Sequence, residues 1–529
     1  MKIFSTKADL VAASLTAGQL TSTKGYTTAG DGGGATYLIK TAVDYAGTPD
    51  GYGDHTLANG NVAVLQTEGS VNVKQFGATG DGTTDDTASI QAAVSSLPNR
   101  GGSTYKGGDL FIPSGEYKTS STITFPTNSP THAYISVKGE GSSSHIEWAG
   151  GTDDPMFYFP HSSDRMHIFI DMINMRGETV STDVYRGIPI RIGTPSNPSG
   201  FAINFSVTRC KFNKSSICID AHGEADNVTI DNNYIGSFST AGVKYSQPNN
   251  SGWRVTGNHF RGGAQTATCI LGDATGNGFN WVISNNILQS ASGMGIVSLE
   301  SITGVQLINN YAENSGASDA GDKTPFSFNN CNNVVIEGCL TTGRTGSSAI
   351  YRLTGTGAGF KIGNNFHSVS AMVPNSHYYI SANSTNVTVL GDLSYTTGYT
   401  IKIFETGSTT TNVIRSYRQT TPSGEDYYRT YSPTAEVITL QNAAASGGTI
   451  TLKTVSDSPQ AYHVYAFNSV NNYWSYGVVA RTGTGNALAY NSLFEKNSAL
   501  AISVSGNDII VTNGAGGVRT IEYSLVRIY

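Results

Sequence analysis

The sequence contains few charged residues. Asp, Glu, Lys and Arg make up 13% of its 529 residues, about half the fraction usual in globular domains. No window approaches 18 consecutive apolar residues, so no membrane insertion is predicted, and no block of Lys and Arg indicates nucleic-acid binding. Residues 1–20 lack the apolar segment of a signal peptide. Disorder is not expected either, because 38% of the residues are hydrophobic and the net charge is only −6.

Cysteine is scarce and irregularly spaced. The odd number of five, without a CxxC pair, predicts neither a disulfide framework nor a zinc site. We therefore expect reduced thiols, several of them buried, at Cys210, Cys218, Cys269, Cys331 and Cys339.

Glycine and tyrosine are abundant, with 62 and 28 residues respectively. Together with the many Asn, Ser and Thr residues, they favour strands and turns over helices. The length is well beyond that of one ordinary core and predicts two to four domains.

An internal repeat begins near residue 205. Eight segments align, among them FSVTRCKF, VTIDNNYI, WVISNNIL and FKIGNNFH, at a mean spacing of about 26 residues. Their sixth position is mostly Asn, with the sequence Cys210, Asn233, Asn258, Asn286, Asn310, Cys339, Asn365 and Asp392.

Each repeat predicts one coil of a parallel β-helix. Apolar residues at every second position place one face of a short strand in the core. The polar residues that follow predict a tight bend, and Asn suits it because Asn tolerates the left-handed conformation and can form an amide ladder between coils. A second apolar segment closes each coil, which gives three strands per coil. A propeller is disfavoured because its blades need about 40 residues.

The two ends differ from the repeats. Residues 84–97 have apolar residues at helical spacing, so we expect a helix, begun by Thr84 or Asp85, that caps the β-helix. The glycine-rich residues 25–39 lack the Lys and the helix of a phosphate-binding loop. Alternating strands after residue 436 predict an antiparallel, sandwich-like β domain. The expected domains are residues 1–70, 71–415 and 416–529.

Residues 71–125 carry a family resemblance. The segments FGATGDGTTDD, IQAA and IPSGEY resemble the opening of the pectate-lyase-like right-handed β-helix superfamily, which includes lyases, hydrolases and esterases. Residues 25–39 look like the particle-attachment region of bacteriophage tailspikes. The resemblance implies a homotrimer on the virion, made in the host cytoplasm without a signal peptide. It also implies attachment to a phage tail, baseplate or adaptor protein through the N-terminus, and cleavage of a host capsule or O-antigen.

Two further expectations accompany this resemblance. Relatives often use calcium, but no clustered Asp array requires it here, so no cofactor or metal site is predicted. Asp81, Asp85 and Asp86 could be taken for a catalytic cluster. We interpret them as structural, because Asp81 begins a turn and the other two fall in a first helical turn that favours negative charge.

Candidate site residues come from the closing strand of each coil and the turn after it. Read as one outward column, these positions give Asp220, His222 and Glu224, then Lys244 and Tyr245, then Asp273, Glu300, Ser327, Asn329, Tyr351 and Arg352. Glycoside hydrolysis needs two carboxyl groups about 5–5.5 Å or about 6.5–9.5 Å apart. Asp273 and Glu300 are the preferred pair, and Asp220, Glu224 and His222 are further catalytic candidates.

Elimination is the alternative reaction. A lyase needs a base and a cation near a uronate, which Lys244, Tyr245, His222, Tyr351 and Arg352 could supply. An acidic sugar could also be bound by Arg186 and Arg191, unless these belong to a salt-bridged loop. Both lie in a second charged cluster, which consists of Asp171, Arg176, Glu178, Asp183, Arg186 and Arg191.

The preferred hypothesis is therefore an endo-acting polysaccharide depolymerase, with hydrolysis favoured over elimination. A non-catalytic receptor-binding fibre is the alternative from another class, but it would need few paired acids. A secreted pectinase-like enzyme is a weaker option, because no signal peptide is predicted.

Overall fold

The structure is a computed structural model of the whole chain. It describes residues 1–97 apart from residue 68, most of residues 107–372, and mainly the strands beyond. The gaps before residue 372 are 127–132, 161–165, 182–183, 194–201, 247–249, 263–266, 273–277, 291–295, 315–324 and 346–349. Contacts divide the chain into two units. The first holds residues 1–385, 391–409 and 418–427, and the second holds 386–390, 410–417 and 428–529.

The first 66 residues form a small sheet with two short helices. The order of its strands is β1-β2-β3-β5-β4, and Leu10, Tyr37 and Ile39 lie in its core. The glycine-rich turn closes on the carboxylate of Asp31, which accepts backbone N–H bonds from residues that include Tyr26 and Gly33. The elements are β1 (Lys2–Phe4), α1 (Lys7–Val11), β2 (Leu20–Thr23), β3 (Thr36–Lys40), α2 (Ala42–Tyr45), β4 (His55–Thr56) and β5 (Val62–Gln66).

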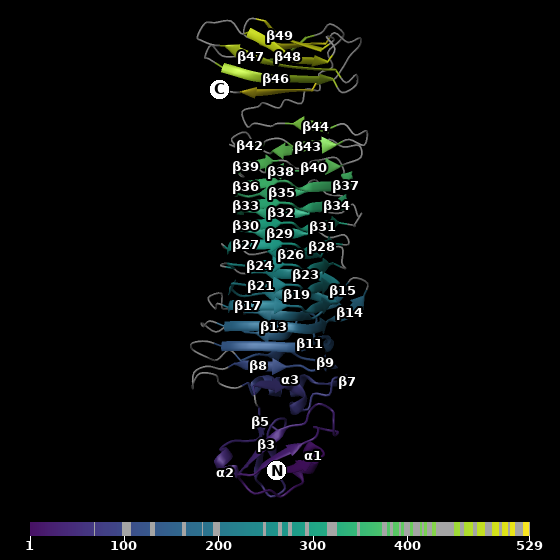
Figure 1. The fold of residues 1–529 in the computed structure, drawn as a ribbon, viewed down its shortest axis with the longest axis vertical. Helices are drawn as coiled ribbons and strands as arrows, with labels where there is room; N and C mark the ends of the chain where they lie inside the picture. The colour runs from purple at the N-terminus through teal and green to yellow at the C-terminus, as the bar shows by residue number, and fades with distance from the viewer. Residues whose placement is uncertain are drawn as a thin grey trace. The chain divides into compact units, whose positions relative to one another are not determined.

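A cap precedes the regular coils. The predicted helix is present as α3 (Thr87–Ser95), which buries Ile90, Ala93 and Val94 at one end of the stack (Figure 1). It begins later than expected and its N-cap is Asp86, which makes no side-chain cap bond. The remaining elements here are β6 (Ser70–Asn72), η1 (Val73–Phe76), β7 (Asp81–Asp85), β8 (Gly108–Phe111), β9 (Gly115–Thr119) and β10 (Ile123–Thr124).

The coils form the predicted parallel β-helix. One face is a sheet of 11 strands in which one strand from each coil pairs in parallel with the next, from β10 to β41. After β10 its strands are β12 (Pro155–Phe159), β16 (Ile188–Ile192), β19 (Ser215–Ala221), β23 (Phe238–Tyr245), β26 (Thr268–Gly272), β29 (Val297–Glu300), β32 (Phe326–Asn329), β35 (Tyr351–Thr354), β38 (Tyr378–Ile380) and β41 (Ile403–Glu405).

Two further runs of parallel strands complete each coil. The long strands β11 (Ala133–Trp148) and β13 (Met166–Arg176) each belong to both runs. The first run continues with β17 (Ala202–Thr208), β20 (Ala225–Asp226), β21 (Thr229–Asp231), β24 (Arg254–Thr256), β27 (Gly278–Ser284), β30 (Ile302–Ile308), β33 (Asn332–Glu337), β36 (Ala358–Gly363), β39 (Thr385–Leu390) and β42 (Val413–Ile414). The second contains β18 (Lys211–Asn213), β22 (Tyr234–Gly236), β25 (His259–Arg261), β28 (Ile287–Ser290), β31 (Tyr311–Asn314), β34 (Leu340–Thr345), β37 (Phe366–Met372), β40 (Leu393–Tyr395) and β43 (Tyr417–Thr420), and β44 (Asp426–Arg429) lies beyond it.

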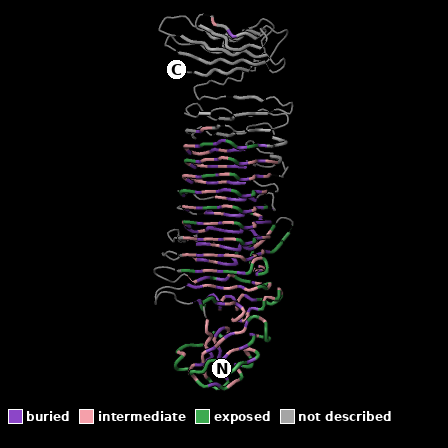
Figure 2. Tube along the Cα trace, in the orientation of Figure 1, coloured by how far each residue is buried: buried purple, intermediate pink, exposed green. Residues whose placement is uncertain are grey.

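Buried and more exposed residues alternate along the coils (Figure 2), and the buried ones form the core. Trp253 and Trp281 stack with ring centroids 4.4 Å apart, and Tyr245 packs on Trp281. One antiparallel hairpin, β14 (Glu178–Ser181) with β15 (Val184–Arg186), stands outside this pattern.

The Asn column forms the predicted ladder. Asn258 donates from its Nδ2 to Oδ1 of Asn286, 3.0 Å away, and Asn286 donates to Oδ1 of Asn310 at 2.9 Å. These amides are buried. The left-handed conformation, however, belongs to the residue before each of them, for example Asn285 with φ 56° and Asn309 with φ 54°. We predicted that the same Asn forms the ladder and adopts the left-handed conformation of the bend. This was wrong, because the buried ladder residue and the left-handed residue before it are two successive positions of each coil.

The second unit contains two antiparallel sheets. Their strand orders are β45-β50-β49 and β48-β47-β46-β51, in keeping with the predicted antiparallel β domain. The strands are β45 (Thr449–Thr454), β46 (Gln460–Asn468), β47 (Tyr473–Arg481), β48 (Ala489–Lys496), β49 (Leu500–Ser505), β50 (Asp508–Asn513) and β51 (Glu522–Arg527). Across the described parts of the chain, no helix has the length and apolarity needed to cross a membrane. The boundaries at residues 70 and 415 stay predictions.

Candidate functional site

The outer surface of the 11-stranded sheet carries most of the candidate residues. Strand pairing aligns one outward side chain per coil, and we call this set the outer row. It consists of Tyr158, Arg191, Asp220, Lys244, Leu271, Ser298, Ser327 and Arg352. A shorter parallel row lies two residues further along the strands and contains Glu300, Asn329 and Thr354; we call it the Glu300 row.

Asp220 is the centre of the charged part of the outer row. Its carboxylate is 1% exposed and accepts a hydrogen bond from Nε of Arg191 at 2.8 Å. Nδ1 of His222 lies 3.4 Å from the same carboxylate oxygen, Oδ2. Burial by itself raises the pKa of Asp220, but the contact with His222 and the charge of Arg191 outweigh it, so the pKa lies below its usual value. Asp220 is therefore an ionised carboxylate that is hydrogen-bonded to Arg191 and has His222 beside it.

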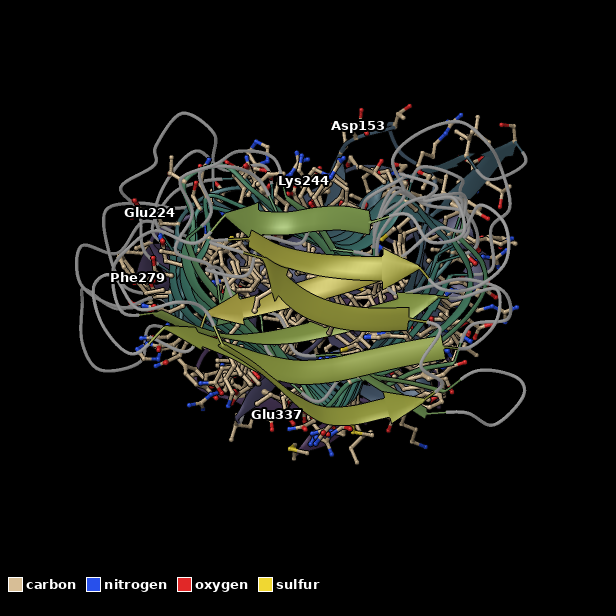
Figure 3. All side chains as sticks on the ribbon, turned by 90° about the horizontal axis from the view of Figure 1, so that it is seen from above. Asp153, Glu224, Lys244, Phe279 and Glu337 are labelled. Carbon is tan, nitrogen blue, oxygen red and sulfur yellow. The ribbon has the colours of Figure 1, made fainter. Side chains whose placement is uncertain are left out.

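Lys244 follows Asp220 on the next coil and is half-buried. Figure 3 shows Lys244 on one face of the coils, Glu337 on the opposite face, and Glu224 toward a side. Glu224 is buried and follows β19 in the turn before β20. The structure thus brings Arg191, Asp220, His222 and Lys244 together, and it places Glu224 at the border of this face.

Tyr245 and Tyr351 were expected on the outer surface, and the structure corrects this. Both lie inside the coils with 1% and 0% exposure. Their neighbours Lys244 and Arg352 occupy the outer row, and successive residues of a strand point to opposite faces, so the tyrosines must point inward. Tyr245 has a structural role there, because its hydroxyl donates to the backbone carbonyl of Glu300 and accepts from its N–H, both at 2.9 Å.

Glu300 lies in the second row. Its two carboxylate oxygens accept hydrogen bonds from the Nδ2 groups of Asn329 and Asn330, at 2.6 and 3.0 Å. Three coil steps separate the strand of Asp220 from that of Glu300. At ~4.8 Å per step this is about 14 Å, beyond the spacing that a glycosidase pair needs. Asp273 lies outside the described residues, so the pairing of Asp273 with Glu300 stays a prediction.

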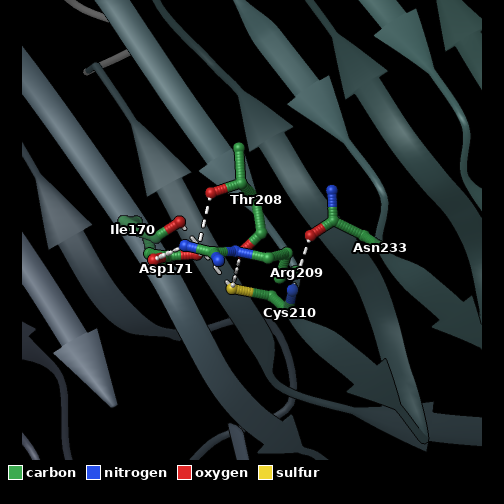
Figure 4. Close-up of polar contacts among 6 residues, drawn as sticks. All are labelled: Ile170, Asp171, Thr208, Arg209, Cys210 and Asn233. Carbon is green, nitrogen blue, oxygen red and sulfur yellow. Dashed lines mark hydrogen bonds and ion pairs between the residues drawn. The ribbon is translucent and has the colours of Figure 1, made fainter. Parts of the chain in front are cut away.

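The second charged cluster does not gather at one place. Arg186 pairs with Glu178 in the hairpin at 3.5 Å, and Arg176 pairs with Glu147 at 3.9 Å. Arg191 belongs instead to the Asp220 site, and Asp183 lies outside the residues described. Asp171 accepts hydrogen bonds from Thr208 and from Nε of Arg209, both at 2.9 Å, next to the ladder bond between Cys210 and Asn233 (Figure 4).

The three early aspartates have the structural roles expected of them. Asp81 accepts backbone bonds from Thr83 and Thr84, and Asp85 accepts from Thr87. Asp86 is buried and accepts from the N–H groups of Thr79 and Gly80. Asp85 and Asp86 precede the first turn of α3 instead of lying in it, because Asp86 closes the preceding loop.

The cysteines are structural as well. All five are free and buried, and burial raises the pKa of the Cys210 thiol to about 12, so this thiol is un-ionised near neutral pH. Where the structure describes side chains, no three His, Cys, Asp or Glu residues form a group that could hold a metal ion.

Sequence reasoning missed the contact between Arg191 and Asp220. It also missed Tyr158, which precedes Arg191 in the outer row. Tyr158 and Arg191 belong to coils that precede the regular repeat, which begins near residue 205. The signal that could have found them is the apolar alternation of PMFYF and IPIRI, whose outward positions are Tyr158 and Arg191.

Comparisons with known proteins agree with this architecture. The family model described as rhamnogalacturonase A/epimerase, pectate lyase-like, matches residues 70–333. Mannuronan C5-epimerase AlgE1 of Azotobacter vinelandii is 40% identical over 79 residues, which are 15% of this chain and 5% of that protein. Alginate lyase 7 of the same organism is 53% identical over 49 residues, 9% of this chain and 5% of the lyase.

A solved structure shows the same fold over nearly the whole chain. The gp42 tailspike of Acinetobacter phage vb_AbaP_AS12 is 14% identical, with a TM-score of 0.51 and a coverage of 95% of each chain. Its identity is too low to indicate more than the fold. The repeated coils and the matched family model together show that residues 70–333 are similar to the β-helices of the pectate lyase-like family.

Proposed function

We propose that this protein binds and depolymerises a bacterial surface polysaccharide, a capsule or an O-antigen, on the outer face of the 11-stranded sheet. The observation that carries the proposal is the buried, ionised Asp220 held between Arg191 and His222. A buried ion pair costs desolvation and often stabilises a fold no better than apolar residues would. Its presence on the outer side of a β-helix therefore favours a functional role.

The tailspike fold supports the biological setting. The AS12 protein is a phage tailspike, and its fold matches this one over 95% of each chain. We propose that this protein also belongs to a virion tail, forms a homotrimer and attaches to the particle through residues 1–70.

The cluster of Arg191, Asp220 and His222 fits β-elimination from a polysaccharide that contains uronate sugars. In that reaction a base removes the proton next to the sugar carboxylate, a C=C bond forms and the glycosidic C–O bond breaks. Asp220 beside Nδ1 of His222 favours the tautomer whose Nε2 carries the free lone pair, so Nε2 is the proposed base. Asp220 also stabilises the imidazolium that forms.

The neighbouring cations have a separate role. Removing a proton next to a carboxylate builds negative charge on that carboxylate, and fixed positive charge lowers the cost of building it. Lys244, one coil from Asp220, is placed to provide such a charge. The glycosidic oxygen that leaves takes up a proton as the bond breaks.

Hydrolysis is the second candidate, favoured by Glu300. Two amide donors hold its carboxylate in a fixed orientation, which suits a base or a nucleophile. The general acid would have to be a second carboxyl group, for which Asp273 is the sequence-based candidate.

One experiment distinguishes the reactions. Purified protein is incubated with capsules and O-antigens from a panel of bacterial strains, and new reducing ends and ultraviolet absorbance are followed together. We expect both signals to rise, because elimination leaves an unsaturated sugar that absorbs. Reducing ends without absorbance would indicate hydrolysis and direct mutagenesis to Glu300. Binding with neither signal would indicate a non-catalytic adhesin.

A further inference from the structure

We infer that a row of outward side chains on the second run of strands is the surface through which parallel copies of this chain associate. The row has one residue on each of six successive coils, and we call it the β22–β37 row. It consists of Tyr234, His259, Ile287, Tyr311, Leu340 and Phe366. The inference rests on the homotrimer of the proposed function and names its contact surface.

The first argument is the composition of the row. Its residues precede buried ones such as Leu288 and His367, so they point outward. Ile287 and Phe366 are each 42% exposed, and none of the six residues is Lys, Arg, Asp or Glu. The strands β28, β31, β34 and β37 follow one another along one side of the stack (Figure 1). Adjacent exposed side chains of this kind are typical of an interaction surface.

The second argument is symmetry. Three copies that share one row must surround an axis parallel to the coils, and rotation about this axis brings each residue to its own equivalent at the same height. A charged residue in the row would then face like charges, which opposes association. Self-association along a row therefore requires that the row is uncharged, whereas a different protein could pair opposite charges with it. The β22–β37 row meets this requirement over five coil steps of ~4.8 Å, or about 24 Å.

The other two faces of the described coils do not meet it. The outer row of the 11-stranded sheet contains Asp220 and Lys244 on adjacent coils. The corresponding row of the first run contains Arg254 and Lys361, which are both exposed. Equivalents of these residues would face like charges in a parallel assembly.

A polysaccharide fits the β22–β37 row less well than another copy does. The side chains of Ile287, Leu340 and Phe366 have no polar atom, and sugar hydroxyls buried against them would lose hydrogen bonds with water. Polar groups lie beside the row and bind one another. Nε2 of His259 is 2.8 Å from Oε1 of Gln289, and Nε2 of Gln289 donates to Glu313 at 2.8 Å. An apolar centre with polar residues beside it is the usual anatomy of a protein–protein interface.

The test places opposite charges at position 287 of the full-length chain. Ile287→Lys and Ile287→Glu, each by itself, bring like charges together, so we expect association to need at least about tenfold more protein. Co-expression of the two variants with different tags should restore mixed oligomers, which native mass spectrometry detects. Gln306→Lys and Gln306→Glu, at an exposed position of the first run, are the matched controls and should associate as the wild type does.

A second measurement does not depend on dissociation. Ile287→Cys should form a disulfide between copies on mild oxidation, because the equivalent residues lie together, and Gln306→Cys should not. The five native cysteines are buried and do not compete.

Three results would overturn the inference. An oligomer in which Ile287→Cys forms no cross-link would do so and would leave the homotrimer proposal standing, whereas a monomeric wild type would overturn both. Loss of association in both charge variants without rescue on co-expression would show that position 287 meets a different residue. Normal association with lost polysaccharide binding in these variants would assign the row to the glycan. Turnover is measured on the same preparations, so the catalytic proposal can fail separately.

Discussion

The Asn ladder and the outer row run along the same coils and follow opposite rules. The ladder has Asn on most coils, because each amide has the equivalent amide of the next coil as its partner. The outer row changes from Arg191 to Asp220 to Lys244 to Leu271 in successive coils. Repetition is thus required where a residue binds its own equivalent, and it is absent where a residue binds a different one, as Asp220 binds Arg191.

The first way to test this comparison is to change the irregular row. Asp220→Asn should reduce turnover by about 10²–10⁴-fold, the usual contribution of acid–base catalysis, because a neutral amide no longer orients His222 or stabilises its charged form. We expect the dissociation constant for uncleaved polysaccharide to change far less, since Lys244 and Arg352 are retained. Initial rates and equilibrium binding measure the two effects.

Lys361→Gln, on another face, is the control for Asp220→Asn and should retain full turnover. A fully active Asp220→Asn variant would show that Asp220 is not needed for catalysis, and Glu300 would then be the acid to test.

The second test is to interrupt the ladder. Asn286→Val should lower the free energy of unfolding by about 2–4 kcal/mol, because buried groups that pair with the amide would lose their partners. The N–H of Asn258 and the carbonyl of Val255 would lose the partner that Asn286 provides. Nδ2 of Asn258 and Oδ1 of Asn310 would each lose one of two hydrogen bonds. Denaturant unfolding followed by circular dichroism measures the loss.

Gln306→Val provides the comparison, because Gln306 is an exposed amide in a strand of the same β-helix. It should change stability by less than about 0.5 kcal/mol. Equal effects of the two substitutions would contradict a stabilising role of the ladder.

The third test separates the ladder from the adjacent bend. Asn285 is exposed and has φ 56°, so Asn285→Val should cost about 1–2 kcal/mol through backbone strain alone. Asn285→Gly should be close to neutral, because glycine adopts this conformation without a steric penalty. If both variants were destabilised to the same extent, the side chain of Asn285 and not its backbone would be responsible.

The smallest expected effect is the dependence of stability on pH at Asp220. Its pKa is lower in the folded protein than the ~3.9 of an unfolded chain. The ion pair therefore contributes stability above about pH 4, and this contribution is lost as the pH falls through the folded pKa. The thermal midpoint of the wild type should fall more steeply than that of Asp220→Asn between about pH 5 and pH 2. Parallel curves would show that the Arg191–Asp220 pair adds no stability.

The sequence was sufficient for the coils because their periodicity is local. Apolar alternation and the Asn column occur in every repeat, so one error in alignment is corrected by the neighbouring repeats. The bend was assigned one position too late, at the ladder residues and not at residues such as Asn285 and Asn309, because Asn is common at both positions.

The site was harder to predict, because it does not repeat. Asp220, His222 and Lys244 were found from their position in a closing strand, but Tyr245 and Tyr351 were placed on the wrong side of it. Arg191 was grouped with residues near it in sequence, although its partner Asp220 is 29 residues away. Which side chains meet across coils depends on strand register, and a shift of one residue reverses every side chain of a strand.

The sequence by itself determined the parallel β-helix, its capping helix and its amide ladder, because each follows from a pattern carried within single repeats. Only the tertiary structure decided which charged residues share a face and which aromatic residues fill the core. Those relations join residues of different coils, and they depend on how many residues each loop inserts between one strand and the next.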